Sequence, residues 1–327
     1  SFEAETNRSS QPVDLLLPER ALVAMGGGKD SLVALDMMLQ SGMEVLPACV
    51  GSSSLIRDTV KAASLPLLQI RRELSPELMK MNAAGAWNGH VPVTAINSAI
   101  LVCAALLYGY RYVIFANERS ADEATLFDAN GNAVNHQYSK SSDFERAWLE
   151  VMHDQVSRDL DCFSLLRPFS ELEIVRRFSK LKQYHSVYSS CNRNFHLAGE
   201  AISGRWCGNC PKCRFAALSL AVFLPPETVI GIMGTDLLDD PEQENGLREL
   251  CALGRDKPFE CVGEKNESRA ALAALNKKQD WRNKVLVKRL VPELAGLEVP
   301  SLEALLQPSE KHSIPAAVLS RIQGLVS

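Results

Sequence analysis

The sequence predicts an α/β protein built on a doubly wound parallel sheet. Short apolar runs alternate with segments of helical periodicity through residues 20–120, and strands that alternate with helices are typical of parallel sheets. Loops at residues 26–28, 51–54 and 117–120 follow three of these runs, at the end of the strands where such a sheet binds its ligands. The 327 residues are 46% hydrophobic, which is ordinary globular usage and sufficient for a large core.

The predicted elements follow one another in a regular order. We expect buried strands at residues 21–25, 44–50, 67–71 and 112–116, and helices at residues 31–40, 58–63 and 92–108. The last helix is so apolar that its whole surface is expected to be buried, including Cys103. The loops at residues 26–28, 51–54 and 117–120 follow predicted strands, so they are expected to converge on one site.

The pattern changes after residue 120. Residues 122–143 are polar and contain the turn signal Asn130-Gly131-Asn132, and a loop of that length is more often functional than idle. Helical periodicity resumes at residues 144–160. Ser170 and Glu173 form a capping-box pattern that opens the next helix, which assigns Glu173 a structural role.

The chain is expected to divide into two parts. Residues 1–235 would form the main domain, including a cysteine cluster at 191–213, and residues 236–327 a small, mostly helical C-terminal lobe. A net charge of −4 argues against a broad, sequence-independent grip on nucleic acid. The longest apolar stretch, 99–108, is half of what a bilayer requires, and the polar residues 1–11 lack a signal-peptide core. We therefore expect a cytoplasmic location and no membrane partner.

The stretch Met25-Gly26-Gly27-Gly28-Lys29-Asp30-Ser31 contains the main chemical signal. A strand, then glycines, then a helix N-terminus directs backbone N–H groups at an anion. A Walker A loop is excluded, because Val23 occupies its first glycine position and Asp30 follows the lysine. A dinucleotide fingerprint fails at Ser31, where its third glycine belongs. A glycine-rich turn without a ligand remains as the alternative.

This stretch resembles the SGGxDS signature of PP-loop ATP pyrophosphatases, with Gly26 in place of the first serine. The resemblance implies that the chain binds ATP with Mg²⁺ and releases pyrophosphate. The backbone of Gly26, Gly27, Gly28 and Lys29, with the Ser31 hydroxyl, would hold the pyrophosphate. Asp30 would hold or orient Mg²⁺, and Lys29 would neutralise the leaving group. Gly51, Ser52 and Ser53 would line the adenosine side.

Four cysteines form a second pattern: Cys191, followed by Cys207, Cys210 and Cys213 at x2 spacings. Such spacing suits a tetrahedral structural Zn²⁺. An iron–sulfur cluster, or a reactive thiol at Cys191, are the alternatives. His185 or His196 could replace Cys191 as the fourth ligand.

The glycine loop followed by a cysteine cluster is similar to 7-cyano-7-deazaguanine synthase. The ordered set of motifs over residues 20–220 resembles more fully the ATP-dependent UDP-N-acetylmuramoyl-L-alanyl-L-glutamate epimerases of bacterial peptidoglycan synthesis. The stretches that carry this resemblance are Gly27-Gly-Lys-Asp-Ser31, Asn88-Gly-His-Val-Pro92, Asn117-Glu-Arg-Ser-Ala121, Asn135-His-Gln-Tyr-Ser-Lys140, Ser190-Cys-Asn-Arg193 and Trp206-Cys-Gly-Asn-Cys-Pro-Lys-Cys213.

The resemblance implies a reaction in which the glutamate carboxylate of the UDP-linked muramoyl dipeptide is adenylated and its α-carbon is inverted, with release of AMP and pyrophosphate. Proton exchange at that carbon needs acid/base groups, for which the candidates are His90, Glu118, His136, Tyr138 and Lys140. Arg193, Arg205 or Lys212 could bind phosphate or carboxylate groups. The alternative functions are a 7-cyano-7-deazaguanine synthase-like or tRNA-modifying PP-loop enzyme, and a nucleotide-binding regulator.

Overall fold

The computed structural model describes residues 11–326, except residues 88–90, 124–125, 136, 196–201, 203, 255–256, 259 and 261. Its centre is a five-stranded sheet in the order β3-β2-β1-β4-β7, with every pairing parallel. The strands are β1 (Arg20–Ala24), β2 (Glu44–Val50), β3 (Leu68–Ile70), β4 (Tyr112–Phe115) and β7 (Asp161–Ser164). The chain therefore runs outward from β1 to one edge and then, from β4, to the other, which is the predicted doubly wound arrangement.

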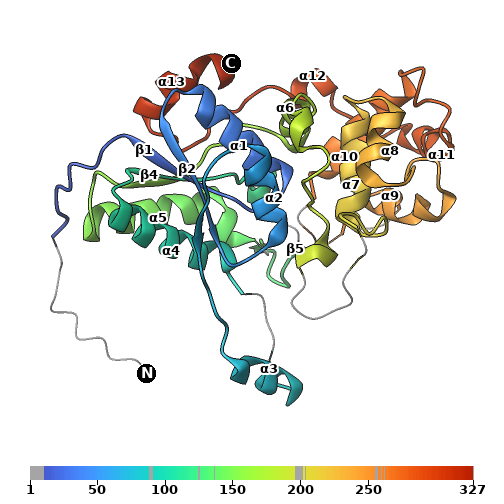
Figure 1. Ribbon diagram of the computed structural model, residues 1–327. Helices are drawn as coiled ribbons and strands as arrows, with labels where there is room; N and C mark the ends of the chain where they lie inside the picture. Colours follow the sequence, from blue (N-terminus) through green and yellow to red (C-terminus); the bar gives the residue numbers. More distant parts are fainter. Residues whose placement is uncertain are drawn as a thin grey trace.

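Helices cover both faces of the sheet (Figure 1). Successive β1 residues point to opposite faces, so that Ala21 and Val23 join the core beneath α1 (Lys29–Gln40), whereas Leu22 joins the core beneath α4 (Val93–Tyr108) and α5 (Ser142–Gln155). The strands are consequently apolar on both faces, as strands of buried parallel sheets must be.

The rest of the chain is mostly helical. The remaining α-helices are α2 (Ser54–Ala62), α3 (Pro76–Ala83), α6 (Glu171–Phe178), α7 (Pro211–Ala221), α8 (Pro226–Met233), α9 (Glu244–Leu250), α10 (Lys265–Asn276), α11 (Val285–Leu290), α12 (Leu302–Leu305) and α13 (Ala316–Val326). The 3₁₀ turns are η1 (Arg119–Asp122), η2 (Tyr138–Lys140), η3 (Lys182–Tyr184), η4 (Asn192–Phe195), η5 (Pro241–Gln243) and η6 (Val291–Leu294).

The helices after α6 do not have a separate core. The buried hydrophobic cluster beneath α1 continues through α6 and α7 to α10 and α11, where it encloses Trp281. Helices α7 to α11 form the lobe at the right of Figure 1, and α13 returns to pack on α1. Among the described residues, no helix combines the length and apolar character needed to cross a bilayer.

Several elements differ from the sequence-based prediction. The strand β7 and the helix α3 were not predicted. Helix α4 was expected to be buried all round, and this is wrong: Cys103 is exposed, and Leu107 is 84% exposed near the helix end. An apolar helix on one face of a sheet needs to bury only the side that contacts the strands, and the periodicity of a nearly all-apolar segment does not reveal which side that is.

The polar stretch after residue 120 contains a small hairpin. Strands β5 (Leu126–Phe127) and β6 (Ala133–Val134) pair antiparallel. The Asp128 carboxylate accepts hydrogen bonds from the backbone N–H groups of Asn130 and Asn132, and Gly131 takes the positive φ of 80° that the turn needs. The predicted turn is therefore confirmed.

Candidate functional site

A cavity of about 480 Å³ opens at the carboxyl ends of β1, β2 and β4, a volume typical of small-molecule sites. The predicted convergence of three loops at this edge is confirmed, because Gly26 and Gly28, Ser52 and Ser53, and Asn117 and Glu118 all line it. Helix α7 forms the opposite wall with Phe215, Ala216, Ser219 and Leu220.

The glycine loop forms a cradle at the start of α1. Gly28 is the N-cap of the helix and no side chain caps it, so the first-turn N–H groups are left available to an anion. Gly27 has a φ of 79°, and a Cβ at Gly28 would lie 3.1 Å from the Ser190 hydroxyl oxygen. The Ser31 hydroxyl donates to the Gly28 carbonyl and also lines the cavity. These features fit the predicted phosphate site.

Lys29 lies in the cavity wall but its ammonium is already paired. Nζ donates to Asp30 Oδ1 at 2.6 Å and to Glu171 Oε2. Burial alone would lower the pKa of Lys29, but the two carboxylates outweigh burial and raise its pKa above the ordinary value. Lys29 is therefore a buried cation, and it would meet a phosphate group only by exchanging one of these partners.

Three glutamates with raised pKa values lie at this ion pair, and one of them, Glu171, belongs to it. Burial raises the pKa of Glu118 to about 7, with a further contribution from the Glu267 charge. Burial likewise raises the pKa of Glu171 to about 7 against the opposing effect of Lys29, and that of Glu267 to about 7, reinforced by Glu171. Groups that titrate near neutral pH can both accept and donate a proton, and Glu118 and Glu171 face the cavity.

Sequence reasoning missed Glu171 and Glu267. Ser170 caps α6 by accepting from the Glu173 N–H, as predicted, and Glu173 is held by Arg176 and Arg177 on the same helix. Glu173 therefore has a structural role, but through these arginines and not through the bond to the Ser170 N–H that a capping box would add. The neighbouring Glu171 enters the cavity. Recognising β7 would have placed Glu171 just beyond a strand's carboxyl end. Glu267 accepts from the Leu172 N–H at the start of α6, and nothing in its local sequence signals that contact.

A buried arginine holds two of the cavity loops together. Arg167 is 2% exposed; its guanidinium donates to the Glu118 carbonyl at 2.9 Å and to the Lys140 carbonyl at 2.6 Å. It also pairs with Glu145 on α5. Glu118 and Lys140 both line the cavity, so Arg167 positions two candidate acid/base residues through their main chains.

The other candidate residues are dispersed. Lys212 lines the cavity, whereas Tyr138 is 56% exposed and is absent from the lining, as are Gly27 and Gly51. Arg205 is engaged by the Val187 carbonyl and by Asp58. The candidates His90, His136 and His196 lie outside the described residues.

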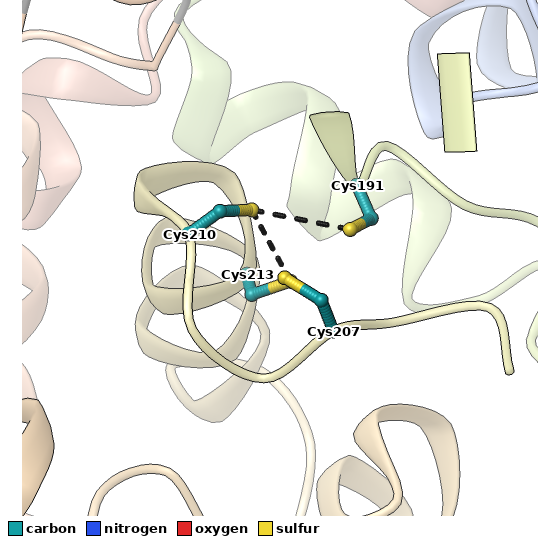
Figure 2. Close-up of side chains that lie close together, drawn as sticks. All are labelled: Cys191, Cys207, Cys210 and Cys213. Carbon is teal, nitrogen blue, oxygen red and sulfur yellow. Dashed lines mark hydrogen bonds between the residues drawn. The ribbon is translucent and has the colours of Figure 1, made fainter. Parts of the chain in front are cut away.

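The four predicted cysteines lie together (Figure 2). Their sulfurs are all within 4.8 Å of one another, with Sγ–Sγ distances of 3.4 Å for Cys210–Cys213, 3.7 Å for Cys207–Cys213 and 4.0 Å for Cys191–Cys210. Zn–S bonds of about 2.3 Å at tetrahedral angles separate sulfurs by about 3.8 Å. The thiols therefore fit a tetrahedral metal.

The environment of the cluster favours a structural role. Cys191 is fully buried, which does not suit a thiol that must meet a second substrate. Cys210 is the N-cap of α7 and Cys213 lies in its first turn, so a metal there would secure the start of the helix that forms a cavity wall. His185 instead faces the Phe178 carbonyl.

The carboxylates that line the cavity belong to Asp30, Glu118 and Glu171. Among the described residues, these carboxylates do not form a group of three close enough to hold a metal ion by themselves, and Asp30 would contribute one carboxylate. Mg²⁺ in nucleotide sites is commonly held by one or two carboxylates together with substrate phosphates and water. The residues therefore fit an ion that arrives with the nucleotide.

The fold and the cavity define an α/β protein in which an anion-binding glycine loop and buried acid/base groups share one site. Two family models match the chain: the MurL N-terminal domain over residues 1–165 and the MurL C-terminal domain over residues 187–304. The chain belongs to the MurL family. The division of the chain at residue 235 stays a prediction.

Curated relatives support this membership. The chain is 46% identical over 306 residues to the UDP-N-acetyl-alpha-D-muramoyl-L-alanyl-L-glutamate epimerase of Xanthomonas oryzae pv. oryzae, covering 93% of the chain and 68% of the relative. It is 44% identical to the Salinispora tropica protein of that name, over 84% of the chain and 60% of the relative. A tRNA-5-methyluridine(54) 2-sulfurtransferase of Thermus thermophilus is 30% identical over 42% of the chain and 41% of its own length. The chain thus spans 60–68% of the two epimerases.

The raised pKa values of the buried glutamates make stability depend on pH. The folded state holds these protons more tightly than the unfolded chain, where the pKa is about 4.5. Their stabilising contribution is therefore complete below about pH 4.5 and is lost as pH rises through about 7. We expect urea unfolding of the ligand-free protein to show this loss. Glu118→Gln should reduce the loss by at least about one third, because it removes one of the three titrating groups and also the charge that helps to raise the pKa of Glu171. Glu77→Gln, a change at an exposed glutamate, is the control. If the free energy of unfolding falls equally with pH in the native protein and in both variants, Glu118 does not have the raised pKa assigned to it.

The cysteine geometry predicts one zinc per chain. Loss of a residue that only hydrogen-bonds to a metal ligand typically lowers metal affinity by about 10–100-fold. Cys207→Ser removes a ligand itself, so it should lower zinc affinity by at least that factor and also lower the melting temperature. Cys251→Ser, a change at a buried thiol outside the cluster, is the control for general damage to the core. Elemental analysis and chelator competition measure the effect, and full zinc retention by Cys207→Ser would refute the site.

Proposed function

We propose that this chain catalyses the ATP-dependent epimerisation of the terminal glutamate of UDP-N-acetylmuramoyl-L-alanyl-L-glutamate, a step of peptidoglycan synthesis. The observation that carries the proposal is the presence, in one cavity, of a glycine cradle and of Glu118 and Glu171. The names of the relatives supply the substrate class.

Adenylation explains why an epimerase would consume ATP. The α-proton of a glutamate with a free carboxylate is very weakly acidic, because its removal leaves a dianion. Attack of the carboxylate oxygen on the α-phosphorus forms an acyl-adenylate and expels pyrophosphate, which removes the carboxylate charge. A base can then take the α-proton, and its return on the opposite face inverts the centre. Water finally cleaves the adenylate to the epimerised carboxylate and AMP.

The glycine cradle supports the first half of this reaction. Backbone N–H groups at the start of α1 and the Ser31 hydroxyl would hold the departing pyrophosphate. Asp30 would hold Mg²⁺, whose charge would offset the repulsion between the triphosphate and the cavity carboxylates. Ser52 and Ser53 would line the adenosine side.

The buried carboxyl groups support the second half. Removal from water, reinforced by the nearby Glu267 charge, raises the pKa of Glu118 to about 7, which suits a group that must take a proton and return it. The Arg167 guanidinium donates a hydrogen bond to the Glu118 carbonyl and so positions the loop that carries Glu118. Lys140 also lines the cavity and is the second acid/base candidate, from a different loop.

Asp30→Asn should lower pyrophosphate release from ATP and substrate by at least about 100-fold, the usual effect of losing one preorganised charge at such a site. The nearby Asp36→Asn, on the same helix but bonded to Gln40, is the matched control and should retain near-native release. Circular dichroism checks that both proteins fold. Near-native turnover by a folded Asp30→Asn protein would refute the proposed role of Asp30.

Turnover in D₂O should place deuterium at the glutamyl α-carbon of the product, and only when ATP is present. Glu118→Gln should lower this incorporation by about 100-fold or more, the usual contribution of a general base, while pyrophosphate release continues. In the native protein, incorporation should rise with pH through about 7, because the base must be ionised. Consumption of ATP without deuterium in any acyl substrate would favour a nitrile-forming or tRNA-modifying PP-loop enzyme instead.

A further inference from the structure

The glycine loop is in direct contact with the segment that leads into the cysteine cluster. The segment that leads into Cys191 lies against the loop: the Ser189 N–H donates to the Gly27 carbonyl at 3.3 Å. Ser190 lies so close to Gly28 that even a Cβ there would crowd its hydroxyl. Ser189 and Ser190 both line the cavity, although they are only one or two residues from a cluster cysteine.

Ser189 is the junction between these two parts. Its side chain is fully buried, and its hydroxyl donates to the Arg205 carbonyl at 2.6 Å. The same oxygen accepts from the Cys191 N–H at 3.1 Å and from Asn194 Nδ2 at 2.9 Å. The Ser189 side chain therefore links the segment that carries Cys191 to the segment that carries Cys207.

Further contacts make this junction stiff. Arg205 donates to the Val187 carbonyl at 2.7 Å, and the Tyr188 ring packs edge-on against the Trp206 ring at a centroid distance of 5.2 Å. The two segments are therefore bonded at successive positions from residue 187 to the cysteines. In a closely packed segment with this many contacts, a displacement at one end is transmitted to the other end.

We propose that Ser189 is a positioning residue that couples occupancy of the glycine loop to the order of the cysteine cluster. A nucleotide phosphate in the cradle fixes Gly27 and Gly28, and through Ser189 it fixes the backbone that presents Cys191 and Cys207 to a metal. By thermodynamic reciprocity, a correctly bound metal holds the cradle in its anion-binding shape. The cluster would then serve the phosphate site as well as the fold. This inference rests on the proposed nucleotide binding.

Hydrogen exchange read by mass spectrometry tests the coupling locally. The zinc-loaded protein is compared with and without Mg²⁺ and an ATP analogue that cannot be cleaved between the α- and β-phosphates. In the native protein the analogue should slow exchange at least about fivefold, the lower end of typical coupling, both in the cradle and in peptides containing Cys191 and Cys207. Ser189→Ala should lose the protection of the cysteine peptides and bind the analogue at least about fivefold more weakly.

A matched variant controls for the loss of a buried hydroxyl. Ser41 is also buried, donates to the Met38 carbonyl and accepts from the Met43 N–H, but it lies at the far end of α1. Ser41→Ala should keep the native pattern. If Ser189→Ala does not fold, Asn194→Ala, which removes the donor to Ser189 and to the Arg205 carbonyl, decides the question by the same loss of protection.

The outcomes separate the inference from the proposed function. Binding of the analogue with protection confined to the cradle would overturn the coupling and leave nucleotide binding intact. Native protection of the cysteine peptides in Ser189→Ala would overturn the role of Ser189. Failure of the analogue to bind at all, seen by calorimetry, would overturn the proposed function and the inference with it.

Discussion

The buried ammonium of Lys29 is the interaction on which much of the architecture depends. A cation out of water is strongly destabilising unless carboxylates surround it, so the first turn of α1 must lie against Glu171 at the first turn of α6. Glu267 then ties α10 to the same turn through the Leu172 N–H. The C-terminal helices are thereby brought to the edge of the sheet, and the cavity acquires walls from both halves of the chain. The hydrophobic core that runs without interruption from α1 to α11 has the same consequence.

This arrangement combines two chemical environments in one cavity. Uncapped backbone N–H groups and Asp30 lie on the side next to β1 and suit a nucleotide with its metal, whereas removal from water raises the pKa values of Glu118 and Glu171 to about 7. The acyl-adenylate that we propose would need both environments, with its phosphorus near the glycine loop and its α-carbon near a base. Arg167 and Ser189 bond to the main chain of the loops that carry these groups, so the shape of the site also depends on residues outside the acid/base set.

Two features that depend on contacts between residues close in sequence were predicted correctly, whereas a strand and the burial of a helix, which depend on distant residues, were not. The turn at Gly131 and the Ser170 cap are governed by contacts within four residues, and both were predicted. The strand β7 was missed, and with it Glu171, because four residues of mixed polarity, Asp161–Ser164, have no strand pattern. It forms since the exposed edge of β4 supplies hydrogen bonds along its length. The burial of α4 was overestimated for a related reason, since the sheet covers only one side of that helix.

What the sequence by itself determined was the alternation of strands and helices, the glycine cradle and the four cysteines. Each of these features depends on composition or on residue spacing over a short stretch of chain. Over such a stretch, backbone sterics and metal-ligand geometry permit few other structures. Only the tertiary structure decided that Lys29 is paired with Glu171, that Glu267 reaches across from α10, and that Ser189 joins the cradle to the cysteines. The physical reason is that burial and long-range pairing set the charge and the hydrogen bonds of those groups, and residues more than 90 positions apart in the chain create them.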